Sequence, residues 1–164
     1  MRLDARDLKI LMELQAEGRI TNQRLADRVS LSPSACLERV RRLEAGGLIR
    51  GYRAVVALDK VLRGSTVFVE VTLKRHESGD FKRFERKILD TPEVVECHAI
   101  GGGIDYLLKV VATDIAHYQD IMEELLGADI GIGTYFTYVV TKPIKQAGVY
   151  PLDRLVDRSR EVVE

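Results

Sequence analysis

The stretch SLSPSACLERVRRL, residues 30–43, decides the fold of the first part of the chain. Ser32 followed by Pro33 predicts the start of a helix, because serine caps a first turn well and proline already has the backbone angle of the next position. The apolar residues that recur at helical spacing predict one narrow buried stripe of Cys36, Val40 and Leu43. The other face carries small polar groups followed by arginines, which suits a helix that lies in the major groove of DNA.

Two further helices are expected ahead of this stretch. Asp4 is a good N-cap for a first helix over residues 4–17, which ends at Gly18. Thr21 or Asn22 then caps a short second helix, and a tight turn joins it to the third. Three helices with this spacing predict a helix-turn-helix domain.

The residues after the third helix predict a wing. Two glycines end that helix, and residues 48–58 can be interpreted as two short extended pieces about Gly51. Arg50 and Arg53 lie beside this glycine, where they are placed to contact backbone phosphates. Such contacts add affinity without sequence information.

Composition supports a globular protein with an unevenly distributed charge. The chain has 164 residues, of which 46% are hydrophobic and 30% charged, and its formal net charge is zero. Residues 1–60 hold 12 Lys and Arg against 8 Asp and Glu, so residues 61–164 hold the remaining 13 against 17. A basic first part joined to an acidic second part favours a nucleic-acid partner for the first.

Several other classes of protein are excluded by the sequence. No signal peptide or membrane span is recognisable, so we expect a cytoplasmic, nucleoid-associated protein. Cys36 and Cys97 are the only cysteines and lie far apart, which predicts no disulfide framework and no thiolate metal site. We expect both to be reduced core residues.

The second part of the chain predicts a ferredoxin-like domain. Strands are expected over 66–74, 94–100, 105–111 and 132–141, and helices over 81–89 and 115–125. The order βαββαβ places an antiparallel sheet under two helices on one face, so the fold class is α+β. The expected domains are a winged helix-turn-helix over 1–61, a ligand-binding and dimerisation domain over 62–142, and a tail over 143–164.

The other face of this sheet predicts self-association. Valines, Tyr106, Phe136 and Tyr138 on these strands are too apolar for bare exposure, so we expect this face to pair with a second copy. A symmetric dimer would also present two recognition helices to successive major grooves.

The loop GGGIDY, residues 101–106, is the candidate ligand site. Three glycines leave backbone N–H groups open to a carboxylate, and Asp105 is suited to an ammonium group, so an amino acid would fit. The alternative is an ordinary glycine-rich turn. The loop is not a dinucleotide fingerprint, because no helix opens behind a GxGxxG pattern.

The chain closely resembles the Lrp/AsnC family, also called feast/famine regulators. The resemblance rests on LSPS (31–34), CLERVRRL (36–43) and GLIRGY (47–52), joined later by DYLLK (105–109) and TYVV (137–140). It covers about residues 3–142. It implies a sequence-specific DNA-binding transcriptional regulator whose assembly or DNA binding responds to an amino acid or related molecule, and which controls genes of amino-acid metabolism.

The resemblance also implies which residues form the sites. The two-helix motif would span about residues 22–41, and the effector pocket would lie between subunits of dimers that gather into octamers. The expected DNA-binding residues are Asn22, Arg24, Ser32, Ser34, Ala35, Glu38, Arg39, Arg41, Arg42, Arg50 and Arg53. The expected ligand-binding residues are Gly101, Gly102, Gly103, Ile104, Asp105, Tyr106, Thr137 and Tyr138. The family often has an acidic residue where this chain has Gly103, so a cationic ligand group would lose a partner there.

Two other readings of the sequence compete with this one. An architectural protein that bends or wraps DNA without an effector would show the same helix-turn-helix. An enzyme would need a reactive constellation, and the best candidate is Cys97 beside His98. Neighbours on a strand point to opposite faces, so this histidine is not placed to activate the thiol, and we expect no enzyme, metal or cofactor.

The end of the chain has no functional interpretation. Residues 151–164 predict a short amphipathic helix with Leu152, Leu155, Val156 and Val162 on its apolar side.

Overall fold

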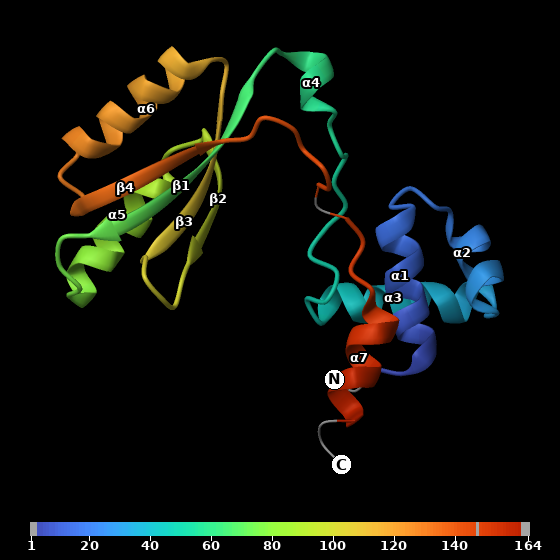
Figure 1. Cartoon of the computed structure of the whole chain (residues 1–164). Helices are drawn as coiled ribbons and strands as arrows, with labels where there is room; N and C mark the ends of the chain where they lie inside the picture. Colours follow the sequence, from blue (N-terminus) through green and yellow to red (C-terminus); the bar gives the residue numbers. More distant parts are fainter. Residues whose placement is uncertain (1–2, 147, 162–164) are drawn as a thin grey trace. The chain divides into compact units, whose positions relative to one another are not determined.

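The computed structural model describes residues 3–146 and 148–161 (Figure 1). It divides into two compact units. The first consists of Met1–Val55 and Lys145–Glu164, and the second is Val56–Ile144. No helix among the described residues is both long and apolar enough to cross a membrane.

The first unit contains the three expected helices. They are α1 (Ala5–Ala16), α2 (Asn22–Val29) and α3 (Pro33–Ala45). Asp4, Thr21 and Ser32 cap them, each side chain accepting a backbone N–H from the first turn. These caps stabilise helix ends whose N–H groups have no partner within the helix.

The turn between α2 and α3 sets the angle of the third helix. Ser30 adopts a left-handed conformation with φ 56°, and the N–H of Leu31 then donates to the Ala26 carbonyl oxygen over 3.0 Å. The core below this turn is small. Its buried apolar residues are Ile10, Leu25, Ala26, Val29, Cys36 and Leu43.

The expected wing does not form a strand pair. Residues 48–57 are all described, and none of them is in a strand. The N–H groups of Leu48 and Ile49 both donate to the Leu43 carbonyl oxygen, over 3.0 and 3.2 Å, and this turns the chain back onto the end of α3. A short hairpin without a neighbouring strand is only marginally stable, which the pattern of apolar residues alone does not reveal.

The chain returns to the first unit with a fourth helix, α7 (Leu152–Glu161). Gln15 on α1 accepts the Tyr150 N–H over 2.9 Å and donates to the Tyr150 carbonyl oxygen over 3.5 Å. This helix falls in the stretch where a short helix is expected. Of its expected apolar side, Leu155 is exposed and Val162 lies outside the described residues.

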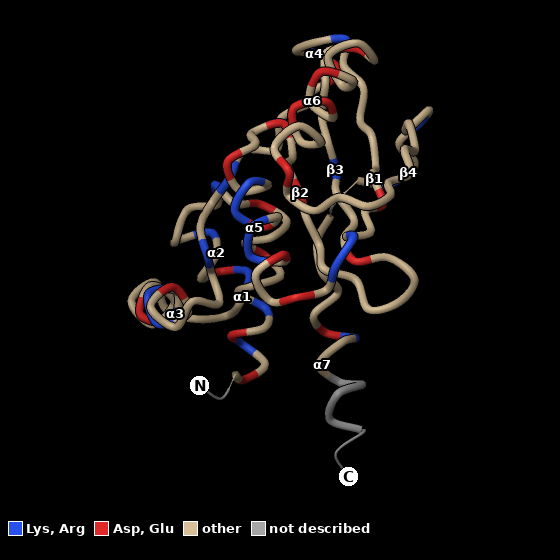
Figure 2. Tube along the Cα trace, turned by 90° about the vertical axis from the view of Figure 1, so that its left-hand side faces the viewer, with Lys and Arg blue, Asp and Glu red and all other residues tan. Residues whose placement is uncertain are grey.

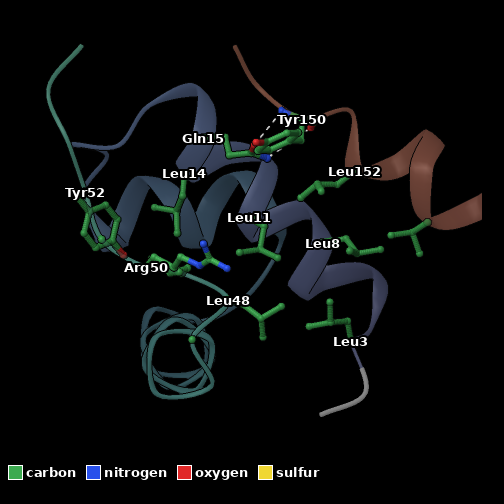
Figure 3. A pocket seen from close by; sticks show the side chains of 14 residues that line it. Leu3, Leu8, Leu11, Leu14, Gln15, Leu48, Arg50, Tyr52, Tyr150 and Leu152 are labelled. Carbon is green, nitrogen blue, oxygen red and sulfur yellow. Dashed lines mark hydrogen bonds between the residues drawn. The ribbon is translucent and has the colours of Figure 1, made fainter. Parts of the chain in front are cut away.

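The returning segment borders a groove on the first unit. It is an open, apolar groove with a volume of about 760 Å³ (Figure 3). Leu8, Leu11 and Leu14 from α1, Leu48, and Tyr150 and Leu152 from the returning chain are among its lining residues.

The second unit is the expected four-stranded antiparallel sheet with two main helices. Its elements are α4 (Leu58–Val61), β1 (Ser65–Leu73), α5 (Ser78–Leu89), β2 (Val94–Ala99), β3 (Tyr106–Ala112), α6 (Ile115–Gly127) and β4 (Ile132–Val139). The strand order is β2-β3-β1-β4, the ferredoxin-like arrangement. The short helix α4 precedes β1 and contains no buried residue.

The two sheet faces differ from expectation in one respect. Tyr106 pairs with Val71 in the β1–β3 register, and both belong to the buried core that α5 and α6 complete. Phe136 and Tyr138 pair with Glu70 and Phe68 on the opposite face and are exposed. Tyr106 and the buried valines of β1 therefore do not contribute to the uncovered face, because residues paired directly across strands share one face, whereas Val111 pairs with Thr66 on the uncovered side.

Candidate DNA-reading helix and effector loop

The three arginines of α3 fall into two groups. Arg39 donates to Asp4 over 2.6 Å and to Asp7 over 2.8 Å, and Arg42 donates to both oxygens of Asp7 over 2.8 Å. Arg41 is exposed, and no ion pair is found for it among the described residues. Figure 2 shows acidic positions on α1 as well as the basic positions on α3.

The sequence alone did not predict these contacts of α3 with α1. The sequence places Arg39 and Arg42 outside the buried stripe of α3, and in the structure both guanidinium groups bind carboxylates of α1, while the Arg42 side chain stays 48% exposed. The reason is the carboxylate of Asp7, which is only 1% exposed and lies 32 and 35 residues away in sequence. Periodicity within α3 cannot reveal a partner on another helix. Whether either arginine contacts DNA stays a prediction.

The outward face of α3 also contains residues that make no contact with α1 among the described ion pairs. Ser34, Glu38 and Arg41 are exposed, whereas Ala35 is half-buried. The hydroxyl oxygens of Ser32 and Ser34 lie 3.2 Å apart, and the Ser32 oxygen also accepts the Ala35 N–H. Sequence reasoning missed Leu37, which is 38% exposed. Leu37 lies outside the buried stripe that contains Cys36, and this position in the sequence indicates that it is exposed. An exposed apolar side chain on this helix is suited to contact a thymine methyl group.

The predicted residues on α2 make structural contacts. The Asn22 amide nitrogen donates to the Pro33 carbonyl oxygen over 2.8 Å and so links the starts of α2 and α3. Arg24 donates to Glu17 over 3.1 Å at the surface.

The two predicted arginines after α3 are both exposed. These are Arg50 and Arg53, and Arg50 lines the groove of Figure 3.

The glycine loop of the second unit is exposed and closed by backbone hydrogen bonds. Gly101, Gly102 and Gly103 are all exposed. The Ile100 N–H donates to the Asp105 carbonyl oxygen over 2.8 Å, and the Asp105 N–H donates to the Val71 carbonyl oxygen over 2.9 Å. The loop is therefore held next to the end of β1, with Ile104 half-buried beneath it.

The carboxylate of Asp105 already has partners within the chain. One oxygen accepts the Leu73 N–H over 2.7 Å and lies 3.0 Å from Nε2 of His76. The side chain of Asp105 is 18% exposed, and that of His76 is 58% exposed. Sequence reasoning did not connect His76 with this loop, because 29 residues separate it from Asp105.

The other predicted ligand contacts are not brought together within one chain. Tyr106 is buried and donates its hydroxyl to Glu85 over 2.8 Å. Burial and this carboxylate raise the pKa of Tyr106 above its usual range. Thr137 lies 2.6 Å from the Tyr118 hydroxyl on the covered face, whereas Tyr138 donates to Glu70 on the uncovered face. Thr137 also lines a groove between α6 and β4, together with Met122, Tyr135 and Val139.

The distance along β1 separates the loop from Tyr138. The loop is bound at Val71, and Tyr138 is paired with Phe68, three residues earlier. At about 3.3 Å per residue this is roughly 10 Å. One small amino acid cannot contact both regions of a single chain.

Cys97 and His98, the candidate reactive pair of an enzyme, do not face each other. Cys97 packs against the core, whereas His98 is exposed, so the two neighbours point to opposite faces. Burial raises the pKa of both the Cys36 and Cys97 thiols above its usual value, and a protonated thiol is a poor nucleophile. Among the described residues, no group of three His, Cys, Asp or Glu side chains is placed to hold a metal ion.

Comparisons with known proteins match both units. A family model described as the Lrp/AsnC ligand binding domain matches residues 66–150, and one described as winged helix-turn-helix DNA-binding matches residues 3–50. The transcriptional regulatory protein DoeX of Halomonas elongata is 51% identical over 146 residues, which cover 89% of this chain and 92% of that protein. The leucine-responsive regulatory protein of Escherichia coli K12 is 42% identical over 158 residues, which cover 96% and 93%.

A solved structure also superposes on nearly the whole chain. It is a transcriptional regulator of Neisseria meningitidis in complex with L-methionine, 36% identical to this chain. The TM-score is 0.87, and the match covers 94% of this chain and 99% of the other.

Proposed function

Because the chain belongs to the Lrp/AsnC family of transcriptional regulators, we propose that it binds operator DNA through α3 and that an amino acid bound to the second unit modulates this binding. The observation that carries the proposal is the outward face of α3. A serine-capped helix of 13 residues follows a left-handed turn at Ser30 and leaves Ser34, Glu38 and Arg41 exposed. A regulator of this kind acts at the nucleoid in the cytoplasm.

The residues of the DNA interface have two kinds of role in this proposal. Ser34, Leu37, Glu38 and Arg41 face base edges, because the opposite side of α3 is core. Arg50 and Arg53 follow α3 and contact phosphates, which position the protein without carrying sequence information.

The amino-acid site is proposed at the glycine loop of the second unit. The backbone of the exposed residues 101–103 suits a carboxylate, and Asp105 suits an ammonium group that displaces His76. The relative from Neisseria meningitidis was solved with L-methionine, which supports an amino acid as the ligand class. Tyr138 is too far along β1 to join this site in one chain, so we propose that a second copy completes the pocket.

Self-association follows from the uncovered sheet face. Phe136 is 61% exposed and Tyr138 is 50% exposed on the sheet face opposite α5 and α6. We propose a homodimer through this face. The octamer of four dimers stays a prediction from the family resemblance.

The proposal is tested with the full chain. Duplexes enriched by the protein from a random-sequence library are footprinted with and without a panel of amino acids that includes L-methionine, and binding of each amino acid is measured by calorimetry. We expect an enriched sequence whose footprint or affinity changes with one amino acid. The two effects must be reciprocal, because coupling between two ligands is a shared free energy.

Two outcomes would contradict different parts of the proposal. If no sequence is enriched, α3 does not read an operator. If a sequence is enriched but no amino acid produces heat or alters the footprint, the effector part is wrong and the architectural alternative replaces it.

A further inference from the structure

Asp7 is a buried carboxylate at the contact between α1 and α3. Its side chain is 1% exposed, and its two oxygens accept hydrogen bonds from Arg39, from Arg42 and from the backbone N–H of Asp4. A lone ionised carboxylate in this position would be strongly unfavourable. The two arginines therefore supply the charge and the hydrogen bonds that allow Asp7 to be buried.

The contact extends to the start of α1. The carboxylate of Asp4 accepts the Asp7 N–H over 2.8 Å and also binds Arg39 over 2.6 Å. We call these four residues, Asp4, Asp7, Arg39 and Arg42, the α1–α3 ion network. It joins the N-terminal turn of α1 to the middle and the last turn of α3.

The network constrains the rotation of α3 about its own axis. Arg39 and Arg42 are separated by three residues, so they lie on one flank of the helix, about one turn apart. Both bind the same carboxylate, which is itself fixed on α1. Two anchors along one flank oppose rotation of the helix more strongly than one anchor does.

The orientation of the outward face follows from this constraint. At about 100° per residue, Arg41 lies about 160° around the helix from Arg39, and Ser34 and Glu38 lie on the same outward side. A rotation of α3 would move all three away from the base edges together. Base readout depends on this orientation, because bidentate hydrogen bonds to bases tolerate little displacement.

We propose that Asp7 is the positioning residue of the DNA-reading helix, holding Arg39 and Arg42 against α1 so that the face with Ser34, Glu38 and Arg41 meets the bases. The inference rests on the proposed function. A phosphate that captured Arg39 or Arg42 would leave Asp7 buried with fewer partners, which is why these two arginines are assigned to positioning rather than to DNA contact.

The main test compares Asp7→Asn with wild type in the full chain. The probes are a duplex enriched by the wild type from a random library and a scrambled duplex of equal length. We expect the ratio of specific to scrambled affinity to fall about tenfold, because misplacing one good base contact costs about that factor. Affinity for the scrambled duplex should change little, since phosphate contacts do not depend on the rotation of α3.

A matched control separates positioning from a general loss of charge on α1. Glu13→Gln also removes a carboxylate from α1, but Glu13 pairs with Arg28 on α2 and does not touch α3. It should leave the specificity ratio unchanged. A ratio in Asp7→Asn equal to that of wild type and Glu13→Gln would overturn the inference.

The salt dependence of binding gives a second test that does not need Asp7→Asn to fold. If Arg39 contacts a phosphate, Arg39→Gln should lower the slope of log affinity against log salt by about one. If Arg39 only positions α3, the slope stays unchanged, whereas the specificity ratio falls. A lowered slope with an unchanged ratio would overturn the inference.

Failure of the proposed function is recognised separately. A wild-type protein that enriches no sequence would contradict operator reading, and the inference would fall with it. A wild-type protein that enriches a sequence, with Asp7→Asn equally selective, would overturn only the role of Asp7.

Discussion

The two units of the chain bury charge in different ways. In the second unit, Asp80 is buried at the start of α5, and its partners Arg75 and Arg83 lie within five residues of it in sequence. In the first unit, Asp7 is buried too, but its partners are on another helix. The contacts of Asp80 shape one end of a helix. The contacts of Asp7 join two helices, α1 and α3.

The two units also differ in the sizes of their cores. Among the described residues, the core of the first unit contains six buried apolar residues, and that of the second contains sixteen. A small core buries less apolar surface relative to the entropy that folding costs. We therefore expect the first unit to depend more on its contacts with the returning chain and less on its core than the second unit does.

The largest effect is expected from Phe84→Ala in the second unit. Phe84 is fully buried on α5, and its ring lies 4.5 Å from that of Tyr106. Truncation should destabilise this unit by about 3–5 kcal/mol through lost burial and a cavity. Hydrogen exchange followed segment by segment should show faster exchange in residues 65–139 and little change in α1–α3. Equal acceleration in both units would show that they do not unfold separately.

A somewhat smaller effect is expected from Ile10→Ala in the first unit. Ile10 is fully buried in the small core, so its loss should cost about 2–5 kcal/mol. With so few other core residues, this is a larger share of the stability of the first unit, and its exchange should approach that of the unfolded chain. If α3 amides stay as protected as in wild type, the contrast in core size does not control stability.

A smaller effect again is expected from Gln15→Ala, which breaks the attachment of the returning chain. The amide of Gln15 makes two hydrogen bonds with the backbone of Tyr150 at an exposed position, each contributing about 0.5–1.5 kcal/mol at most. The first unit should lose about 1 kcal/mol, and α7 should become more sensitive to protease. Unchanged proteolysis of the segment around Tyr150 would contradict this.

The smallest effect is expected from Asp4→Asn, and it should depend on pH. The backbone N–H of Asp7 and, next, the Arg39 guanidinium lower the pKa of Asp4 from 3.8 to about 2. Since this pKa is lowered in the folded state, ionised Asp4 stabilises the first unit above its ordinary pKa, and this contribution disappears as the pH falls through about 2. Asparagine can still cap α1.

The measurement is the unfolding free energy of wild type and Asp4→Asn across this pH range. The advantage of wild type should be complete near neutral pH and should shrink as the carboxylate is protonated. An advantage that persists undiminished below the lowered pKa would show that the charge of Asp4 contributes nothing.

Local signals in the sequence predicted most of the fold. Ser32 and Pro33 set the start of α3, and the strict alternation of valines in β1 set which residues face the helices. These features depend on neighbours along the chain, so a single sequence contains them.

Contacts between distant segments were not predictable in the same way. Asp7 carries no local sign that it will bind Arg39, and Tyr106 carries none that its strand register places it beneath α5. The pairing of Asp105 with His76 is of the same kind. For the sites, the residue types were found from the sequence, but their orientation depended on tertiary contacts.

The attachment of Tyr150 to Gln15 determines when the first unit is completed during synthesis. These residues are 135 positions apart, and the whole second unit lies between them in sequence. On the ribosome, α1, α2 and α3 emerge first, but the wall of their groove that Leu152 supplies emerges only after β4. Domains generally fold as they emerge. The second unit therefore has the opportunity to fold before the DNA-binding unit is whole, and a nascent chain stalled after β4 should expose the leucines of α1 to chaperones.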